Sequence, residues 1–70
     1  MAQVKVYYDK IGNTLTVWFD NPQKEYSCEE TGEEVILMKD KGGQVIGFEK
    51  LNFTMAGTEQ LQVAFEAMSV

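Results

Sequence analysis

Two stretches near the start of the chain alternate between apolar and polar residues with a period of two. The apolar members of these stretches are Val4, Val6, Tyr8, Leu15, Val17 and Phe19. This period, together with β-branched and aromatic residues, is typical of β-strands. The intervening segment, residues 9–12, ends in Gly12, which suits the left-handed position that closes a four-residue loop. The pattern predicts a first hairpin over residues 4–19.

A four-residue loop would pair Val6 with Leu15 and Val4 with Val17, which places the apolar side chains on one face. A slip of one residue would instead set Val6 against a threonine and mix the two faces. The opposite face then carries Tyr7 and Trp18. Tyrosine and tryptophan are enriched at interaction hot spots, so we interpret this aromatic pair as a candidate interface anchor.

A second hairpin is predicted from the apolar run 35–38 and the mixed run 45–51, joined by Asp40-Lys41-Gly42-Gly43. Any even pairing places Val35 and Leu37 on one face, and Ile36 and Met38 on the other. Both faces of this hairpin are therefore apolar. Ile36 and Met38 join the interaction candidates, because the C-terminal tail or a partner must cover the second face.

The remaining segments are less regular. Residues 23–34 are polar and predict an exposed loop, with a short edge strand near residues 26–28. In the tail, residues 58–68 alternate as a strand would, but Leu61, Ala64, Phe65 and Met68 also fall at helical spacing. We expect a mainly β fold: a small antiparallel sheet of two consecutive hairpins, or four strands, plus the tail as a fifth strand. The alternative is a C-terminal helix packed on the sheet, in an α+β fold.

Seventy residues suffice for one domain, 1–70, and such small cores often need an additional means of stabilisation. The single cysteine, Cys28, excludes an intrachain disulfide, and the chain has no histidine with which to build a zinc site. Oligomerisation remains as the stabilising device. No cofactor motif is present, because the glycines form neither a dinucleotide fingerprint nor a phosphate loop.

A net charge of −5 with no arginine argues against nucleic acid and anionic membranes as partners. It is compatible with a basic protein partner, although a negative charge also simply keeps a small domain soluble. No apolar run is long enough to span a bilayer, and residues 1–5 do not resemble a signal peptide. We expect a cytoplasmic protein.

The candidates for chemistry are few. The acidic residues of segment 25–34 offer hard oxygen ligands, but their spacing matches no known metal loop, so a solvated loop is expected. Glu49 lies within an apolar strand, where we expect it to pair with Lys39 or Lys50. Cys28 lacks a histidine base and neighbours Glu29, which disfavours a thiolate. We therefore expect no catalytic residue, no metal ligand and no enzyme activity.

Residues 8–17, Tyr-Asp-Lys-Ile-Gly-Asn-Thr-Leu-Thr-Val, resemble the opening of the Domain of Unknown Function 2283 family, with Asn13 where that family usually has Asp. Residues 35–51, with Asp40, the Gly42-Gly43 turn and Val-Ile-Gly-Phe-Glu, are similar to its second half. The resemblance covers about residues 4–51 and leaves 52–70 as a C-terminal extension. It implies a compact β domain without an established activity, and an antitoxin-like association with a small basic protein.

These observations lead to one functional hypothesis and one alternative. The hypothesis is a small acidic protein-interaction module that forms a homodimer or binds a basic protein, through candidates Tyr7, Trp18, Ile36 and Met38. The alternative is a carboxylate-based divalent-metal binder or enzyme that uses the acidic loop and Glu49.

Overall fold

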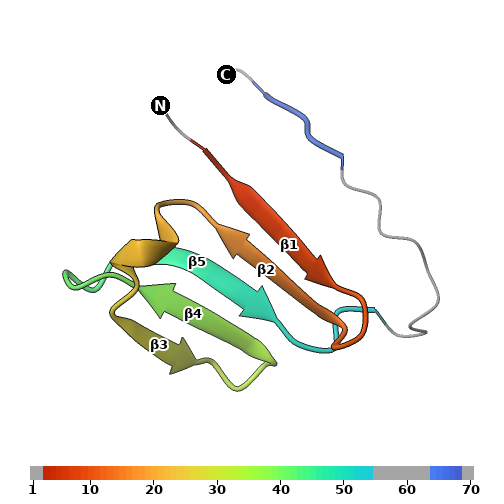
Figure 1. The fold of residues 1–70 in the computed structure, drawn as a ribbon, viewed down its shortest axis with the longest axis horizontal. Coiled ribbons are helices and arrows are strands. Elements are labelled where there is room, and N and C mark those ends of the chain that lie inside the picture. The colour runs from red at the N-terminus through yellow and green to blue at the C-terminus, as the bar shows by residue number, and fades with distance from the viewer. Residues whose placement is uncertain (1–2, 55–63, 69–70) are drawn as a thin grey trace.

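The chain forms one open antiparallel sheet, described here by a computed structural model for residues 3–54 and 64–68. Its strands are β1 (Lys5–Asp9), β2 (Thr14–Trp18), β3 (Ser27–Glu30), β4 (Val35–Lys39) and β5 (Val45–Lys50), with a 3₁₀ turn, η1 (Pro22–Lys24), between β2 and β3. The strand order is β1-β2-β5-β4-β3, so the two hairpins meet where β2 pairs with β5 (Figure 1). The mainly β prediction is confirmed.

The first hairpin has the predicted faces but a different register. Val6 pairs with Val17, and Tyr8 pairs with Leu15, which is two residues away from the predicted pairing. An even shift leaves every side chain on its predicted face. The loop begins one residue later than predicted because the Asp9 side chain accepts hydrogen bonds from the backbone N–H groups of the loop, at 3.0 and 3.1 Å. Asn13, and not Gly12, takes the left-handed conformation, with φ 56°.

The second hairpin, β4–β5, pairs Leu37 with Phe48 and Met38 with Gly47, as the predicted faces require. The register shifts by one residue next to Met38, which marks a β-bulge beside the turn. The turn itself is closed by Gly43, whose φ of 84° favours glycine.

The fifth strand of the sheet lies in the segment that the sequence analysis assigned mostly to a loop. β3 pairs with β4 and forms an exposed edge, which begins one residue later and ends two residues later than the edge strand expected near residues 26–28. In the tail, residues 64–68 are exposed and belong to neither a strand nor a helix. Residues 55–63, which hold most of the expected C-terminal strand or helix, lie outside the described residues.

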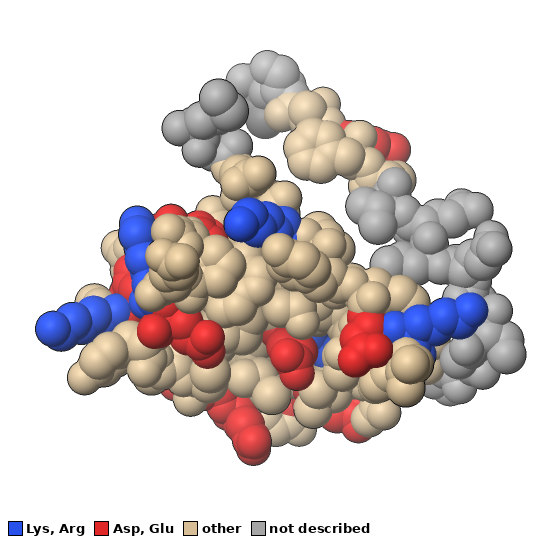
Figure 2. All heavy atoms as spheres, viewed as in Figure 1, with Lys and Arg blue, Asp and Glu red and all other residues tan. Residues whose placement is uncertain are grey.

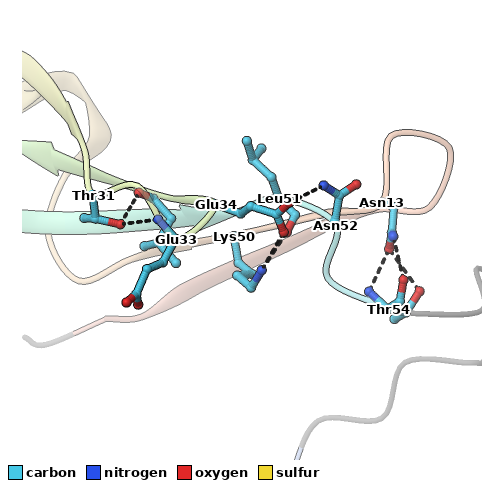
Figure 3. Close-up of polar contacts among 9 residues, drawn as sticks. Asn13, Thr31, Glu33, Glu34, Lys50, Leu51, Asn52 and Thr54 are labelled. Carbon is cyan, nitrogen blue, oxygen red and sulfur yellow. Dashed lines mark hydrogen bonds and ion pairs between the residues drawn. The ribbon is translucent and has the colours of Figure 1, made fainter.

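Polar contacts fasten the chain that leaves β5 to two neighbouring turns (Figure 3). The Asn13 amide donates to the Thr54 carbonyl at 2.8 Å, and its oxygen accepts from both the backbone N–H and the hydroxyl of Thr54 at 3.0 Å. Glu34 accepts from Asn52 at 3.0 Å and lies 3.5 Å from the Lys50 ammonium. These contacts close the end of the sheet at which β2 begins and β5 ends.

In the part of the chain that the structure describes, the sheet forms a single layer, and its interior is correspondingly small. Within the described ranges the buried apolar side chains are Met38, at 4% exposure, and Ile46, at 3%. The strand pairings divide the side chains between the two faces of the sheet. One face carries Val17 and Phe48, and the other carries Trp18 and Met38. We call these the apolar face and the groove face.

Candidate functional site

The groove face carries the four interaction candidates. Trp18 and Met38 both pair with Gly47, which lies between them on β5, so the three form one row across the sheet. Ile36 lies in the next row, and Tyr7 lies on the edge strand β1. The structure therefore brings Trp18, Ile36 and Met38 together, whereas Tyr7 stays apart from them and is 55% exposed.

Gly47 allows Trp18 and Met38 to close over the sheet. A Cβ atom at this buried glycine would lie 2.9 Å from Trp18 Cε3 and 3.3 Å from Met38 Cε. The indole and the thioether thus occupy the space that a side chain at position 47 would need. This is how a single-layer sheet buries Met38: the tryptophan of a neighbouring strand and the methionine share the surface of one glycine.

A hollow of about 360 Å³ opens on this face and extends from β2 across β5 and β4 to β3. Its floor is formed by Trp18, Ile36 and Met38, and three carboxylates surround it: Glu25, Glu30 and Glu49. We call this feature the acidic groove. Figure 2 shows carboxylates spread over the part of the surface that covers β3, β4 and β5 in this view, with lysines extending from the margins. The volume is near the lower end of typical ligand pockets, enough for one or two side chains.

Register explains why two of these carboxylates flank the same apolar side chain. Ile36 pairs with Glu49 on one side and with Glu30 on the other, so the two glutamates flank it. Directly opposed residues have Cβ atoms about 5 Å apart, so each carboxylate can reach the space above Ile36. A cation placed there would be near both.

Glu25 is occupied by a hydrogen bond from Cys28, whose sulfur lies 2.8 Å from the carboxylate oxygen. This bond raises the pKa of the Cys28 thiol, with further contributions from desolvation and from the charges of Glu25 and Glu49. The thiol is exposed. A raised pKa keeps it in the neutral form, which is a poor nucleophile.

The prediction that Glu49 pairs with Lys39 or Lys50 is wrong. Lys39 lies 2.9 Å from Glu29, and Lys50 lies 3.5 Å from Glu34. Alternation explains this, because Glu49 and its neighbour Lys50 point to opposite faces of β5. The two lysines thus neutralise members of the acidic segment on the other side of the sheet. In the part of the chain that the structure describes, no three acidic or sulfur side chains lie close enough together to hold a metal ion.

The apolar face has no such polar features at its centre. One row across the sheet is formed by Val6, Val17, Phe48 and Leu37, all apolar. The next row contains Tyr8, Leu15, Lys50 and Val35. The Lys50 ammonium turns to the margin, where it donates to the Leu51 carbonyl at 2.8 Å. Phe19 packs against Phe48 and Phe53 against Tyr8, with ring centroids 6.0 and 5.9 Å apart.

The floor of the acidic groove could be predicted from the sequence, but its carboxylate rim could be predicted only in part. Glu49 could have been placed from alternation along β5, which sets it on the face of Ile36. Glu25 and Glu30 could not, because their segment carries no clear period and β3 was expected to be mostly loop. The role of Gly47 was also missed, because the contact with Trp18 depends on β2 pairing with β5, which connects two separate hairpins.

Comparison with known proteins identifies a family for this chain. The sequence model of a family described as "Protein of unknown function (DUF2283)" matches residues 5–53, which hold all five strands. No curated protein and no solved structure matches the chain. No helix among residues 3–54 and 64–68 is long and apolar enough to cross a membrane.

Proposed function

We propose that this chain, which belongs to the DUF2283 family of proteins of unknown function, is a protein-interaction module that forms a homodimer through its apolar face. The observation that carries the proposal is that the sheet, as described by residues 3–54 and 64–68, has a single layer. A single sheet has no core of its own, so an apolar face that water covers is destabilising until another layer packs on it. No catalytic step is part of the proposal.

The apolar face has a suitable composition for such packing. Its central row runs from Val6 through Val17 and Phe48 to Leu37, and Val6 remains 43% exposed. Phe19, beside this row, is 49% exposed. The charged groups at its borders are already paired, Lys39 with Glu29 and Lys50 with Glu34, so packing would leave no lone charge there.

The size of the face sets the scale of the interface. Five strands about 4.8 Å apart and five residues long cover about 24 by 17 Å, or roughly 400 Å² in projection. This is about half of the roughly 800 Å² that each partner contributes to a standard interface, so the proposed dimer has a small interface. Two copies related by a two-fold axis would form a sandwich with sheets about 10 Å apart.

The experiment measures the mass of the full chain by size-exclusion chromatography with light scattering. We expect twice the chain mass for the native sequence. Val17→Lys places a charge at the centre of the apolar face and should give a monomer. Thr14→Lys introduces the same charge on β2, on the other face, and should remain dimeric.

Circular dichroism distinguishes an unfolded variant from a folded monomer. The proposal fails if the native chain is a monomer at every concentration, or if the two variants shift the mass equally. Because loss of the dimer could also unfold so small a domain, a native dimer whose unfolding midpoint rises with protein concentration provides an independent criterion.

A further inference from the structure

The acidic groove combines apolar surface with negative charge, a combination that the apolar face lacks. Its floor of Trp18, Ile36 and Met38 is apolar, and its rim of Glu25, Glu30 and Glu49 is anionic. Within the described residues, no lysine lies within ion-pair distance of Glu30 or Glu49, although three lysines pair with other carboxylates. The groove therefore presents negative charge next to an apolar surface. Lys5, which pairs with Trp18 on the edge strand β1, lies on the same face but does not line the hollow.

From this chemistry we infer that the acidic groove binds an extended segment of a basic protein, with a lysine or arginine two residues from an apolar side chain. The inference takes the interaction function as its starting point and concerns the face opposite the proposed dimer interface. The cation would lie above Ile36, between Glu49 and Glu30. The apolar side chain would lie on Trp18 and Met38.

The spacing follows from the sheet. Ile36 and Met38 both belong to β4 and are two residues apart, so their side chains lie about 6.8 Å apart on one face. An extended segment repeats its own side chains at this distance, which lets residues i and i+2 of the segment meet Ile36 and Met38 together. An adjacent pair would point to opposite sides and could place only one side chain in the groove.

Charge and aromatic chemistry favour the same occupant. Two carboxylates flank the position above Ile36, which favours a cation there, and the indole of Trp18 with Met38 offers apolar surface for the second side chain. A free polyamine would satisfy the rim but would leave the floor uncovered. The net charge of −5 would favour encounter with a basic partner.

The test uses the full-length native protein and the fluorescence of Trp18, which is the one tryptophan in the sequence. The probe is the peptide Ac-Ala-Arg-Ala-Leu-Ala-NH₂. We expect a saturable change in Trp18 emission. The analogue with glutamate in place of arginine should give none, and Ac-Ala-Arg-Leu-Ala-Ala-NH₂, in which the two side chains are adjacent, should bind more weakly.

Two protein variants locate the site. Glu49→Gln removes a rim carboxylate and should weaken binding about fivefold, as expected for one partly screened ion pair. Glu33→Gln makes the same change in the exposed β3–β4 turn and should leave the affinity unchanged. Both variants keep the length of the side chain, and light scattering on the same samples reports the dimer separately.

Several outcomes would overturn the inference. The first is the absence of a saturable change in Trp18 emission up to about 1 mM peptide, which is at the weak end of measurable binding. The others are equal binding of the glutamate analogue and equal weakening of binding by the two protein variants. Spermine that binds as tightly as the peptide would show that the groove recognises charge alone, which also overturns it. A monomeric protein that binds the peptide would refute only the dimer, and a dimer that binds no peptide would refute only the groove.

Discussion

Gly47→Ala should destabilise the fold although glycine is a poor strand residue. The added Cβ would lie 2.6 Å from the Val17 carbonyl oxygen and 2.9 Å from Trp18 Cε3. The indole can shift, but the carbonyl belongs to the β2–β5 pairing and cannot move without disturbing it. Overpacking of this kind costs about 1–3 kcal/mol, and the gain from replacing glycine in a strand offsets about 0.5–1 kcal/mol. We expect a net loss of about 1–2 kcal/mol.

Gly42→Ala is the matched control. Its Cβ would meet only the Asp40 carboxylate, at 3.5 Å, in ordinary contact. Its φ is not among the positive values, so alanine fits the backbone. Because alanine reduces the entropy of the unfolded chain, we expect this variant to be neutral or more stable by about 0.5 kcal/mol.

Urea unfolding at equal protein concentration measures the difference, followed by circular dichroism and by Trp18 emission. With a slope of about 1 kcal/mol per molar urea for a chain of this size, the two midpoints should differ by roughly 1–2.5 M. The native-state emission of Gly47→Ala should also shift to the red, because the indole is displaced toward water. Equal midpoints for the two variants would refute the close packing of Trp18 over Gly47.

Two further variants test local features of the structure. Asn13→Ala loses the side-chain contacts with Thr54 and also places alanine at φ 56°, whereas Asn13→Gly loses only the contacts. In urea unfolding, the alanine variant should therefore be less stable than the glycine variant by about 1–2 kcal/mol. Equal stabilities would contradict the left-handed assignment. Glu25→Gln removes the charged acceptor that raises the pKa of Cys28, so iodoacetamide should alkylate the thiol faster at about pH 8, below its ordinary pKa. Glu33→Gln should leave the rate unchanged, and an unchanged rate for both variants would refute the hydrogen bond.

The sheet could be predicted from the sequence because its two hairpins are local. Alternation fixes which side chains share a face, and it did so correctly even where the β1–β2 register was two residues off. The exact loop was not predictable from glycine placement, since Asp9 holds two loop N–H groups and Asn13 provides the left-handed residue. Side-chain hydrogen bonding thus overrode the preference of glycine for such positions.

The pairing of the hairpins with each other was beyond the reach of periodicity. β2 and β5 are separated by 26 intervening residues, and the sequence of neither strand identifies the strand with which it pairs. That pairing sets Trp18 against Gly47 and brings Glu49 beside Thr16. The polar strand β3 was mostly predicted as a loop for a different reason, because Ser-Cys-Glu-Glu has low β propensity. The Lys39–Glu29 ion pair and the backbone pairing with β4 hold it at the edge of the sheet.

The two proposed surfaces lie on opposite faces of one sheet, which constrains how they could act together. If two apolar faces pack about a two-fold axis, the acidic grooves point outward in opposite directions. One extended segment could not occupy both grooves without passing around the sandwich, so each groove should bind its own peptide. Isothermal titration should therefore give one peptide per chain, with equal affinities and no change in light-scattering mass. One peptide per two chains, or a dimer that dissociates as peptide binds, would show that the groove and the dimer interface share the same face.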